Sequence, residues 1–190
     1  MRIALVLIWA IYLALFLRSL KGSLKAKETS WVGLAGLGLQ FAGLGCILSF
    51  RRSPGTPGYW IDTGLNSLGM ACAVAGVVVT RAALQRLGEH WSMTSRLRQQ
   101  HQLITDGPFA RVRHPLYLSF FLLTLGTALT VSDWVGMALG LPLSLAGAAL
   151  RGRMEDRLLR REFGEQFERY AGEVPFLLPD FLSRSSSREG

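Results

Sequence analysis

Residues 115–150 read PLYLSFFLLTLGTALTVSDWVGMALGLPLSLAGAAL, two apolar blocks joined by the short polar turn Val131-Ser-Asp133. The blocks, Leu116–Thr130 and Trp134–Leu150, are each long enough for a helix, and so short a turn makes the two helices antiparallel neighbours. The two ends of this helical hairpin therefore lie at one level. Charged side chains stand directly at both ends, which predicts a shared site built from distant parts of the sequence.

Three further apolar blocks precede the hairpin: Ile3–Leu20, Trp31–Phe50 and Thr63–Thr80. The block Trp31–Phe50 carries no charge over 20 residues, which at about 1.5 Å per residue covers a bilayer core of about 30 Å. The shorter blocks span with tilt, local thinning or snorkelling of flanking arginines. Five such blocks leave too little polar surface for a soluble protein. We expect an all-α polytopic membrane protein with about five transmembrane helices.

The basic residues predict the orientation of these spans. Of the 21 Lys and Arg residues, 18 fall on the first, third and fifth connections, and only Arg2, Arg51 and Arg52 on the other side. The positive-inside rule then puts the N-terminus outside and the C-terminus in the cytoplasm, with both charged ends of the hairpin. The net charge of +8 indicates anionic lipid headgroups as partners. Nucleic acid is not expected, because no basic stripe with interleaved aromatic residues occurs.

Neither the cysteines nor the histidines predict a metal site or a disulfide framework. Cys46 and Cys72 fall inside apolar blocks, where a thiol behaves as a small hydrophobic group. The three histidines, His90, His101 and His114, lack the spacing of a helical metal site. We therefore expect no metal.

The segment after the hairpin predicts an amphipathic helix. Between Glu155 and Tyr170 one stripe is apolar and the charged residues lie mostly elsewhere. Such a cytoplasmic helix lies on the inner leaflet or caps the site. Residues 174–179 are apolar but hold two prolines, so they fold irregularly over the same region, and residues 183–190 are expected to be disordered. The chain reads as one membrane domain, 1–182, in which 1–80 holds three packing spans. The second and third of these spans are rich in Gly and Ala.

The charged ends of the hairpin suggest a receptor for a zwitterion. Pro115 fits the first position of a helix and pushes His114 toward an extended conformation. The helix N-terminus and Arg113 then offer hydrogen-bond donors to a carboxylate or phosphate. Arg151 and Glu155 are four residues apart and share one helix face, where they either pair with each other or serve a ligand. An oxyanion receptor beside a carboxylate fits the amino-acid part of S-adenosylmethionine.

Four ordered motifs carry a resemblance to a known family: Leu87-Gly-Glu-His-Trp-Ser92, His101-Gln-Leu-Ile-Thr-Asp-Gly-Pro-Phe109, Arg113-His-Pro-Leu-Tyr117 and the run Glu155–Tyr170. Together they closely resemble the isoprenylcysteine carboxyl methyltransferase family and its phospholipid methyltransferase relatives. The resemblance implies a polytopic helical enzyme, with five spans in small prokaryotic members. It also implies S-adenosylmethionine bound by residues 87–180 and a lipophilic acceptor that enters from the membrane. The implied location is the prokaryotic inner membrane.

The resemblance assigns roles to particular residues. It implicates in cofactor binding Arg113, His114, Tyr117, Glu155 and Asp156, together with the segment that holds Leu103, Ile104, Gly107, Pro108 and Phe109. Arg151 would lie near the acceptor, and Arg113, Arg151 and Glu155 form the expected catalytic set. The chain departs from the family pattern at Asp156, where a second glutamate is usual, and at Phe109 and Phe167, where the tyrosine hydroxyl is missing.

The resemblance predicts S-adenosylmethionine-dependent methyl transfer to a lipid-like or prenylated acceptor, most like isoprenylcysteine carboxyl O-methylation. N-methylation of an ethanolamine phospholipid and S-methylation of a thiol stay open. A membrane sterol or enone reductase shares an Arg-His-x-x-Tyr motif but uses NADPH and a longer chain. A non-enzymatic scaffold or transporter is the remaining class, and the lack of an inverted repeat argues against transport.

Overall fold

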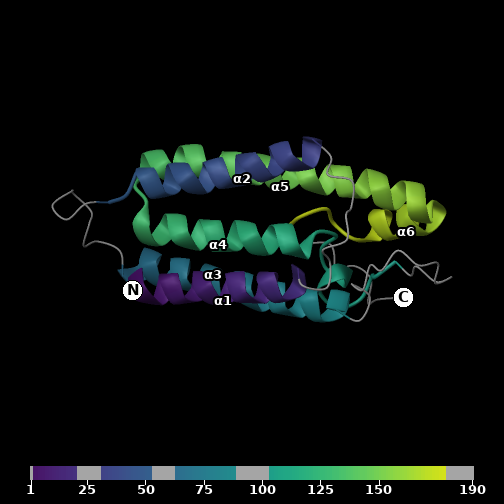
Figure 1. The fold of residues 1–190 in the computed structure, drawn as a ribbon, viewed down its shortest axis with the longest axis horizontal. Coiled ribbons are helices and arrows are strands. Elements are labelled where there is room, and N and C mark those ends of the chain that lie inside the picture. The colour runs from purple at the N-terminus through teal and green to yellow at the C-terminus, as the bar shows by residue number, and fades with distance from the viewer. Residues whose placement is uncertain (1, 21–30, 53–62, 89–102, 179–190) are drawn as a thin grey trace, which may run out of the picture.

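The computed structural model describes residues 2–20, 31–52, 63–88 and 103–178, and all regular secondary structure in these segments is helical (Figure 1). The helices are α1 Arg2–Leu20, α2 Trp31–Ser49, α3 Thr63–Gly88, the 3₁₀ helix η1 Gly107–Ala110, α4 Pro115–Val131, α5 Trp134–Phe163 and α6 Glu165–Glu173. One isolated β-bridge joins Arg51 and Ser132. The expected all-α class is confirmed. Residues 89–102, which hold parts of two motif stretches (89–92 and 101–102), and the expected disordered tail 183–190 lie outside the described residues.

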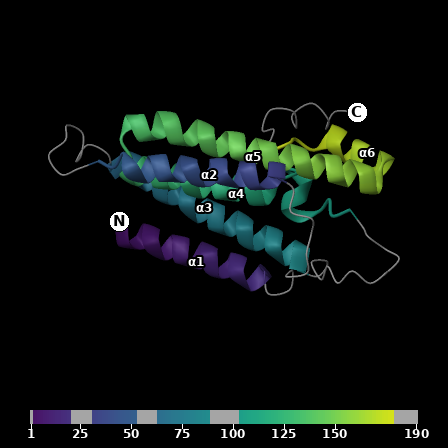
Figure 2. The ribbon, with the colours of Figure 1, turned by 45° about the horizontal axis from the view of Figure 1, so that its top comes forward.

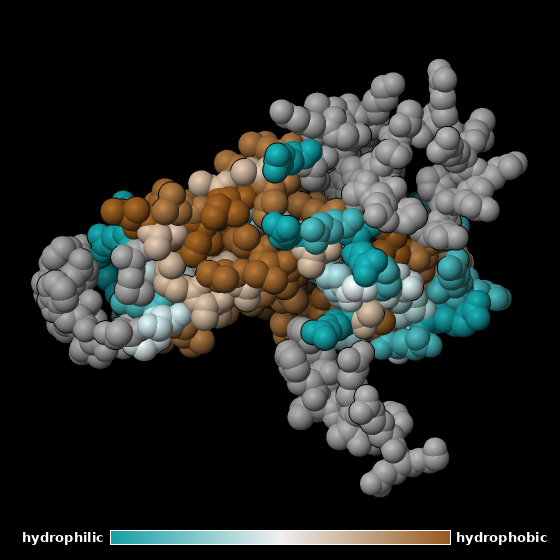
Figure 3. Space-filling model, turned by 90° about the horizontal axis from the view of Figure 1, so that it is seen from below, coloured by the Kyte–Doolittle hydropathy of each residue, from teal (hydrophilic) through white to brown (hydrophobic). Residues whose placement is uncertain are grey.

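Within the described segments, three helices are long and apolar enough to cross a membrane: α2, residues 64–87 of α3, and α5. Helix α4 is a shorter apolar helix. On the face seen in Figure 3, hydrophobic residues cover the middle of the bundle and hydrophilic residues gather toward its two ends. A soluble protein does not expose so wide an apolar band. The chain is therefore an integral membrane protein.

The helices pack as two tight pairs, α2 with α5 and α3 with α4, that meet where α4 contacts α5 (Figure 2). Helix α1 packs outside α3. Glycines allow the close pairing: a Cβ on Gly43 would lie 2.5 Å from the Gly140 carbonyl oxygen, and one on Gly69 would lie 2.8 Å from that of Gly126. Small residues of this kind bring helix backbones together in lipid. The expectation that the small residues of the second and third spans serve packing is confirmed at these positions.

The turn of the hairpin lies where expected and is tied to the end of α2. The Asp133 carboxylate accepts a hydrogen bond from the Gly136 amide at 2.8 Å and so caps α5. The Asp133 amide donates to the Phe50 carbonyl at 2.8 Å, and Arg52 Nε donates to the Ser132 carbonyl at 2.6 Å. These bonds hold the second span against the hairpin at the end of the bundle away from the charged motifs.

The last helices differ from the sequence prediction. Helix α5 continues past Leu150 to Phe163, so Arg151 and Glu155 belong to the same helix as the apolar block. The expected helix Glu155–Tyr170 is interrupted at Gly164, whose φ of 50° ends α5, and α6 then folds back beside it (Figure 1). An ion pair between Arg160 and Glu168 joins the two helices. The fold-back places Tyr170 of α6 against η1, which precedes α4 in the chain.

Candidate active site

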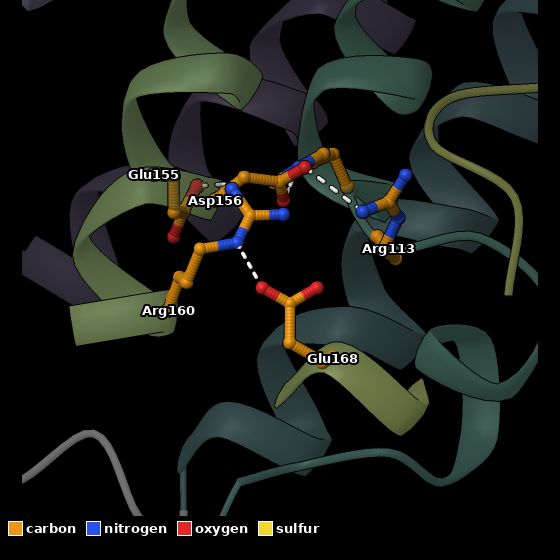
Figure 4. A network of polar contacts seen from close by, with 6 residues as sticks. Arg113, Glu155, Asp156, Arg160 and Glu168 are labelled. Carbon is orange, nitrogen blue, oxygen red and sulfur yellow. Dashed lines mark hydrogen bonds and ion pairs between the residues drawn. The ribbon is translucent and has the colours of Figure 1, made fainter. Parts of the chain in front are cut away.

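The charged motifs meet at the end of the bundle where α4 begins and α5 runs on (Figure 4). Pro115 is the first residue of α4, as predicted, and His114 lies just outside the helix with φ −122° and ψ 64°. This ψ differs from the extended conformation that the sequence predicted for His114. This geometry turns the Arg113 and His114 side chains toward α5. They contact it at residues 155 and 156.

Asp156 lies at the centre of the contact. Its carboxylate accepts a hydrogen bond from Arg113 Nη1 at 2.9 Å, and its other oxygen lies 2.8 Å from His114 Nε2. Asp156 and His114 are buried, with 8% and 4% of their surface exposed. The resemblance placed Asp156 among the cofactor-binding residues, at a position where a second glutamate is usual. Because α4 starts close to α5, the shorter aspartate reaches both partners.

Glu155 approaches the same imidazole from its other side. Its carboxylate lies 3.6 Å from His114 Nδ1, and its side chain is 39% exposed. Burial lowers the pKa of His114, but the hydrogen bonds to Asp156 and Glu155 outweigh it, so the pKa of His114 lies above its ordinary value. We name Arg113, His114, Glu155 and Asp156 the charged cluster. With His114 protonated, it holds two cations and two anions.

Arg151 stands one turn before Glu155 on α5 but has other partners. Its Nη1 donates to Gln40 Oε1 of α2 at 3.0 Å, and its guanidinium lies 4.8 Å from the centre of the Tyr117 ring. Gln40 was not among the site residues predicted from the sequence. The available signal was an amide inside a span that lacks charges, because a polar group in a bilayer is unfavourable unless it is paired.

Aromatic side chains cover the charged cluster. The Tyr117 ring stacks on His114 at 5.5 Å between centroids, and Phe176 meets His114 edge-on at 5.0 Å. The Arg113 guanidinium lies 5.5 Å from the Phe176 ring centre, and the Arg113 amide donates to the Pro175 carbonyl at 2.9 Å. The segment after α6 therefore folds over the site, as the sequence predicted for residues 174–179, of which 174–178 are described. Phe176 is a second contact that the sequence analysis did not name.

The segment of residues 103–109 reaches the site through α6. Tyr170 donates its hydroxyl proton to the Phe109 carbonyl at 2.7 Å, and Leu103 packs against the cluster of Phe167, Tyr170 and Val174. Burial raises the pKa of Tyr170, so its hydroxyl stays a donor. Gly107, with φ 59°, lies beside Arg86 of α3, which pairs with Asp106 at 3.0 Å. Ile104, Gly107 and Pro108 remain candidates by resemblance alone.

The family model described as "Phospholipid methyltransferase" matches residues 65–166. The chain belongs to the phospholipid methyltransferase family. This confirms the resemblance drawn from the motifs. The matched region contains all four residues of the charged cluster and Arg151, whereas Gln40 lies outside it.

The chain is similar to named relatives of two kinds. It is 31% identical to the protein-S-isoprenylcysteine O-methyltransferase of Schizosaccharomyces pombe over 116 residues, 60% of this chain and 48% of the relative. It is 28% identical to the probable protein-S-isoprenylcysteine O-methyltransferase of Oryza sativa subsp. japonica over 153 residues, 75% and 74% of the two chains. It is 35% identical to the nickel-cobalt-cadmium resistance protein NccN of Alcaligenes xylosoxydans xylosoxydans over 131 residues, 67% and 58%. The chain therefore spans about half the length of the fission-yeast relative.

Proposed function

We propose that this protein transfers a methyl group from S-adenosylmethionine to a lipophilic acceptor in the membrane. The observation that carries the proposal is the buried arrangement of Arg113, His114 and Asp156, with Glu155 beside it, inside the region that defines the family. Two cations and two anions at one helix junction suit a ligand that itself carries one charge of each sign. The amino-acid part of S-adenosylmethionine is such a ligand.

The charged cluster retains hydrogen-bonding capacity for this cofactor. Arg113 Nε is buried and has no hydrogen-bond partner among the described residues. A buried donor without a partner destabilises the protein by about 1–3 kcal/mol. A ligand carboxylate would satisfy it, and the part-exposed Glu155 can accept from an ammonium group. The residues present therefore fit the cofactor.

The chain's own contribution to the reaction is position and exclusion of water. The bound cofactor supplies a methyl group on a sulfonium, which needs no nucleophilic side chain. Phe176 and Tyr117 cover the charged cluster, and such closure keeps water from the reacting atoms. Orientation of the two reactants alone can contribute on the order of 7–11 kcal/mol to the barrier reduction.

Arg151 suits the acceptor. Its guanidinium lies between Tyr117 and Gln40, beside the charged cluster and at the end of the apolar part of α5. A lipid-like molecule that enters from the bilayer meets Arg151 before Glu155. A guanidinium there favours an acceptor that carries a carboxylate, as in isoprenylcysteine O-methylation. The family description favours a second candidate, N-methylation of an ethanolamine phospholipid, in which Glu155 would take the amine proton.

We further propose that α1 and α4 also cross the membrane, which gives five spans in one domain of residues 1–182. The N-terminus then lies outside and the charged cluster in the cytoplasm, because 18 of the 21 basic residues fall on that side. We expect the membrane to be a prokaryotic inner membrane. An engineered cysteine near the C-terminus should be protected from an external thiol reagent in intact cells, and free labelling would reverse the orientation.

Two measurements test the proposed reaction. Purified protein should bind S-adenosylhomocysteine in calorimetry and show no response to NADPH, and the opposite pattern would indicate a reductase. Membranes given methyl-labelled S-adenosylmethionine should then yield a labelled lipid. Release of that label by mild base indicates a carboxyl ester, whereas stable label indicates methylation at nitrogen or sulfur.

A further inference from the structure

We propose that a cavity at the other end of the bundle binds one anionic phospholipid. The acyl chain lies between α1 and α2, and the phosphate meets Arg2 and Arg51. The cavity has a volume of about 340 Å³ and is lined by apolar side chains of α1, α2 and α4, with these two arginines at its end. Its size lies within the range of about 300–1,000 Å³ that is usual for small-molecule sites.

The cavity opens to the bilayer side of the bundle. Val6 of α1 and Leu48 of α2, which both line it, are 66% and 42% exposed. Its floor is buried: Leu5 and Val131 are 5% and 7% exposed. An acyl chain can therefore enter sideways from the membrane and lose its contact with neighbouring lipids.

The cavity is separate from the proposed active site. It ends at Val131, the last residue of α4, whereas the charged cluster lies at the first, and the 17 residues of this helix span about 25 Å. Between them the Phe120 ring of α4 contacts Trp9 at 6.0 Å, Tyr12 at 6.3 Å and Phe41 at 6.0 Å. This aromatic group fills the space between α1 and α2 at mid-bundle.

Two hydrogen bonds hold the walls of the cavity in place. Trp9 Nε1 donates to Thr127 Oγ1 at 3.0 Å, which fixes α1 to α4 at the inner end of the cavity. At the other end, Arg2 donates to the Arg52 carbonyl at 3.4 Å and so joins α1 to the end of α2. Helix α1 is thus attached to its neighbours at both ends of the cavity rather than packed along α2.

The charges identify the occupant. The described lining of the cavity contains two arginines and no acidic side chain, so an anionic group is favoured at the end of the cavity where these arginines lie. An apolar cavity with guanidinium groups at one end matches a molecule with a long apolar chain and a phosphate. A phospholipid carries both, and it is always present beside a membrane helix.

Trp9 lines the cavity and reports on its occupant through quenching by brominated lipids. The full-length protein is reconstituted in phosphatidylcholine vesicles that contain equal fractions of brominated phosphatidylglycerol or brominated phosphatidylcholine. The Trp9→Phe variant gives the signal of the other tryptophans for subtraction. Brominated phosphatidylglycerol should quench Trp9 to a given extent at a lower lipid fraction than brominated phosphatidylcholine does. The two fractions should differ by roughly five-fold for each arginine in contact with the headgroup.

Paired variants distinguish a specific lipid-binding site from nonspecific electrostatic attraction of anionic lipid to the protein. The Arg2→Gln/Arg51→Gln double variant should lose the preference for phosphatidylglycerol, and Arg18→Gln, at the other end of α1, should keep it. Equal quenching by both lipids, no quenching of Trp9, or an equal loss in Arg18→Gln would each overturn the proposal. Binding of S-adenosylhomocysteine, measured on the same samples, shows that the variants fold and does not depend on this site.

Discussion

Nη1 of Arg113 lies 2.9 Å from the Asp156 carboxylate, and the two side chains are only 14% and 11% exposed. The pair joins Arg113, two residues before α4, to a turn of α5 beyond its apolar part. Removal of one partner from a buried ion pair leaves an uncompensated charge, which is far less favourable than replacement of both. This pair therefore controls both the stability of the helix junction and the form of the charged cluster.

Replacement of Asp156 tests this role. Asp156→Asn should lower the free energy of unfolding by about 3–5 kcal/mol, because it removes the negative charge between Arg113 and His114 and one of the two oxygens that accept from them. Asp156→Glu restores the residue usual in the family and should retain most of the stability and the binding of S-adenosylhomocysteine. Unfolding monitored by circular dichroism in detergent measures both variants. Equal stability of Asp156→Asn and the unchanged protein would contradict the assignment.

The raised pKa of His114 predicts a dependence of stability on pH. A histidine whose pKa is higher in the folded protein stabilises it fully below the ordinary value of 6.5. That contribution is lost as the pH rises from 6.5 through the higher pKa of the folded state. The midpoint of thermal unfolding should therefore fall over this range, and His114→Gln should flatten the fall. A fall of the same size in His114→Gln would assign the effect to another group.

The sequence predicted the elements of the site better than their mutual contacts. The Pro115 helix start and the meeting of His114 with Glu155 followed from the hairpin. The choice between Glu155 and Asp156 did not, because adjacent helical residues point about 100° apart and the rotation of α5 depends on its packing against α2. The Gln40 contact depends on the same packing.

The end of α5 shows a second limit. The end of an apolar block indicates where a helix leaves the bilayer, which need not be where the helix ends. In α5 the apolar block ends at Leu150, whereas the helix itself continues to Phe163. The same holds for α3, which continues to Gly88 after the apolar block ends at Thr80. Prediction from hydropathy alone therefore made both helices too short. The change of chain direction that brings α6 back beside α5 occurs at Gly164, a position that hydropathy does not distinguish.

The close pairing of α2 and α5 predicts an asymmetry between two glycines of α2. A Cβ on Gly43 would lie 2.5 Å from the Gly140 carbonyl oxygen and 2.8 Å from the Ser144 amide, whereas one on Gly38 meets nothing within 4 Å. Gly43→Ala should lower the free energy of unfolding by about 1–3 kcal/mol through strain. Gly38→Ala should have no effect or stabilise slightly, because alanine favours helix. Equal effects in chemical unfolding would show that the helices are not in backbone contact.

Arg151 and Gln40 should affect the acceptor and spare the cofactor. Gln40→Leu removes the oxygen that Arg151 donates to at 3.0 Å. A hydrogen bond to a charged group contributes about 1.5–3 kcal/mol, so KM for the acceptor should rise roughly 10- to 100-fold. Arg151→Ala should abolish transfer while calorimetry still shows binding of S-adenosylhomocysteine, and the exposed Arg153→Gln serves as the matched control. Loss of cofactor binding in Arg151→Ala, with the fold intact, would instead place Arg151 in the cofactor site.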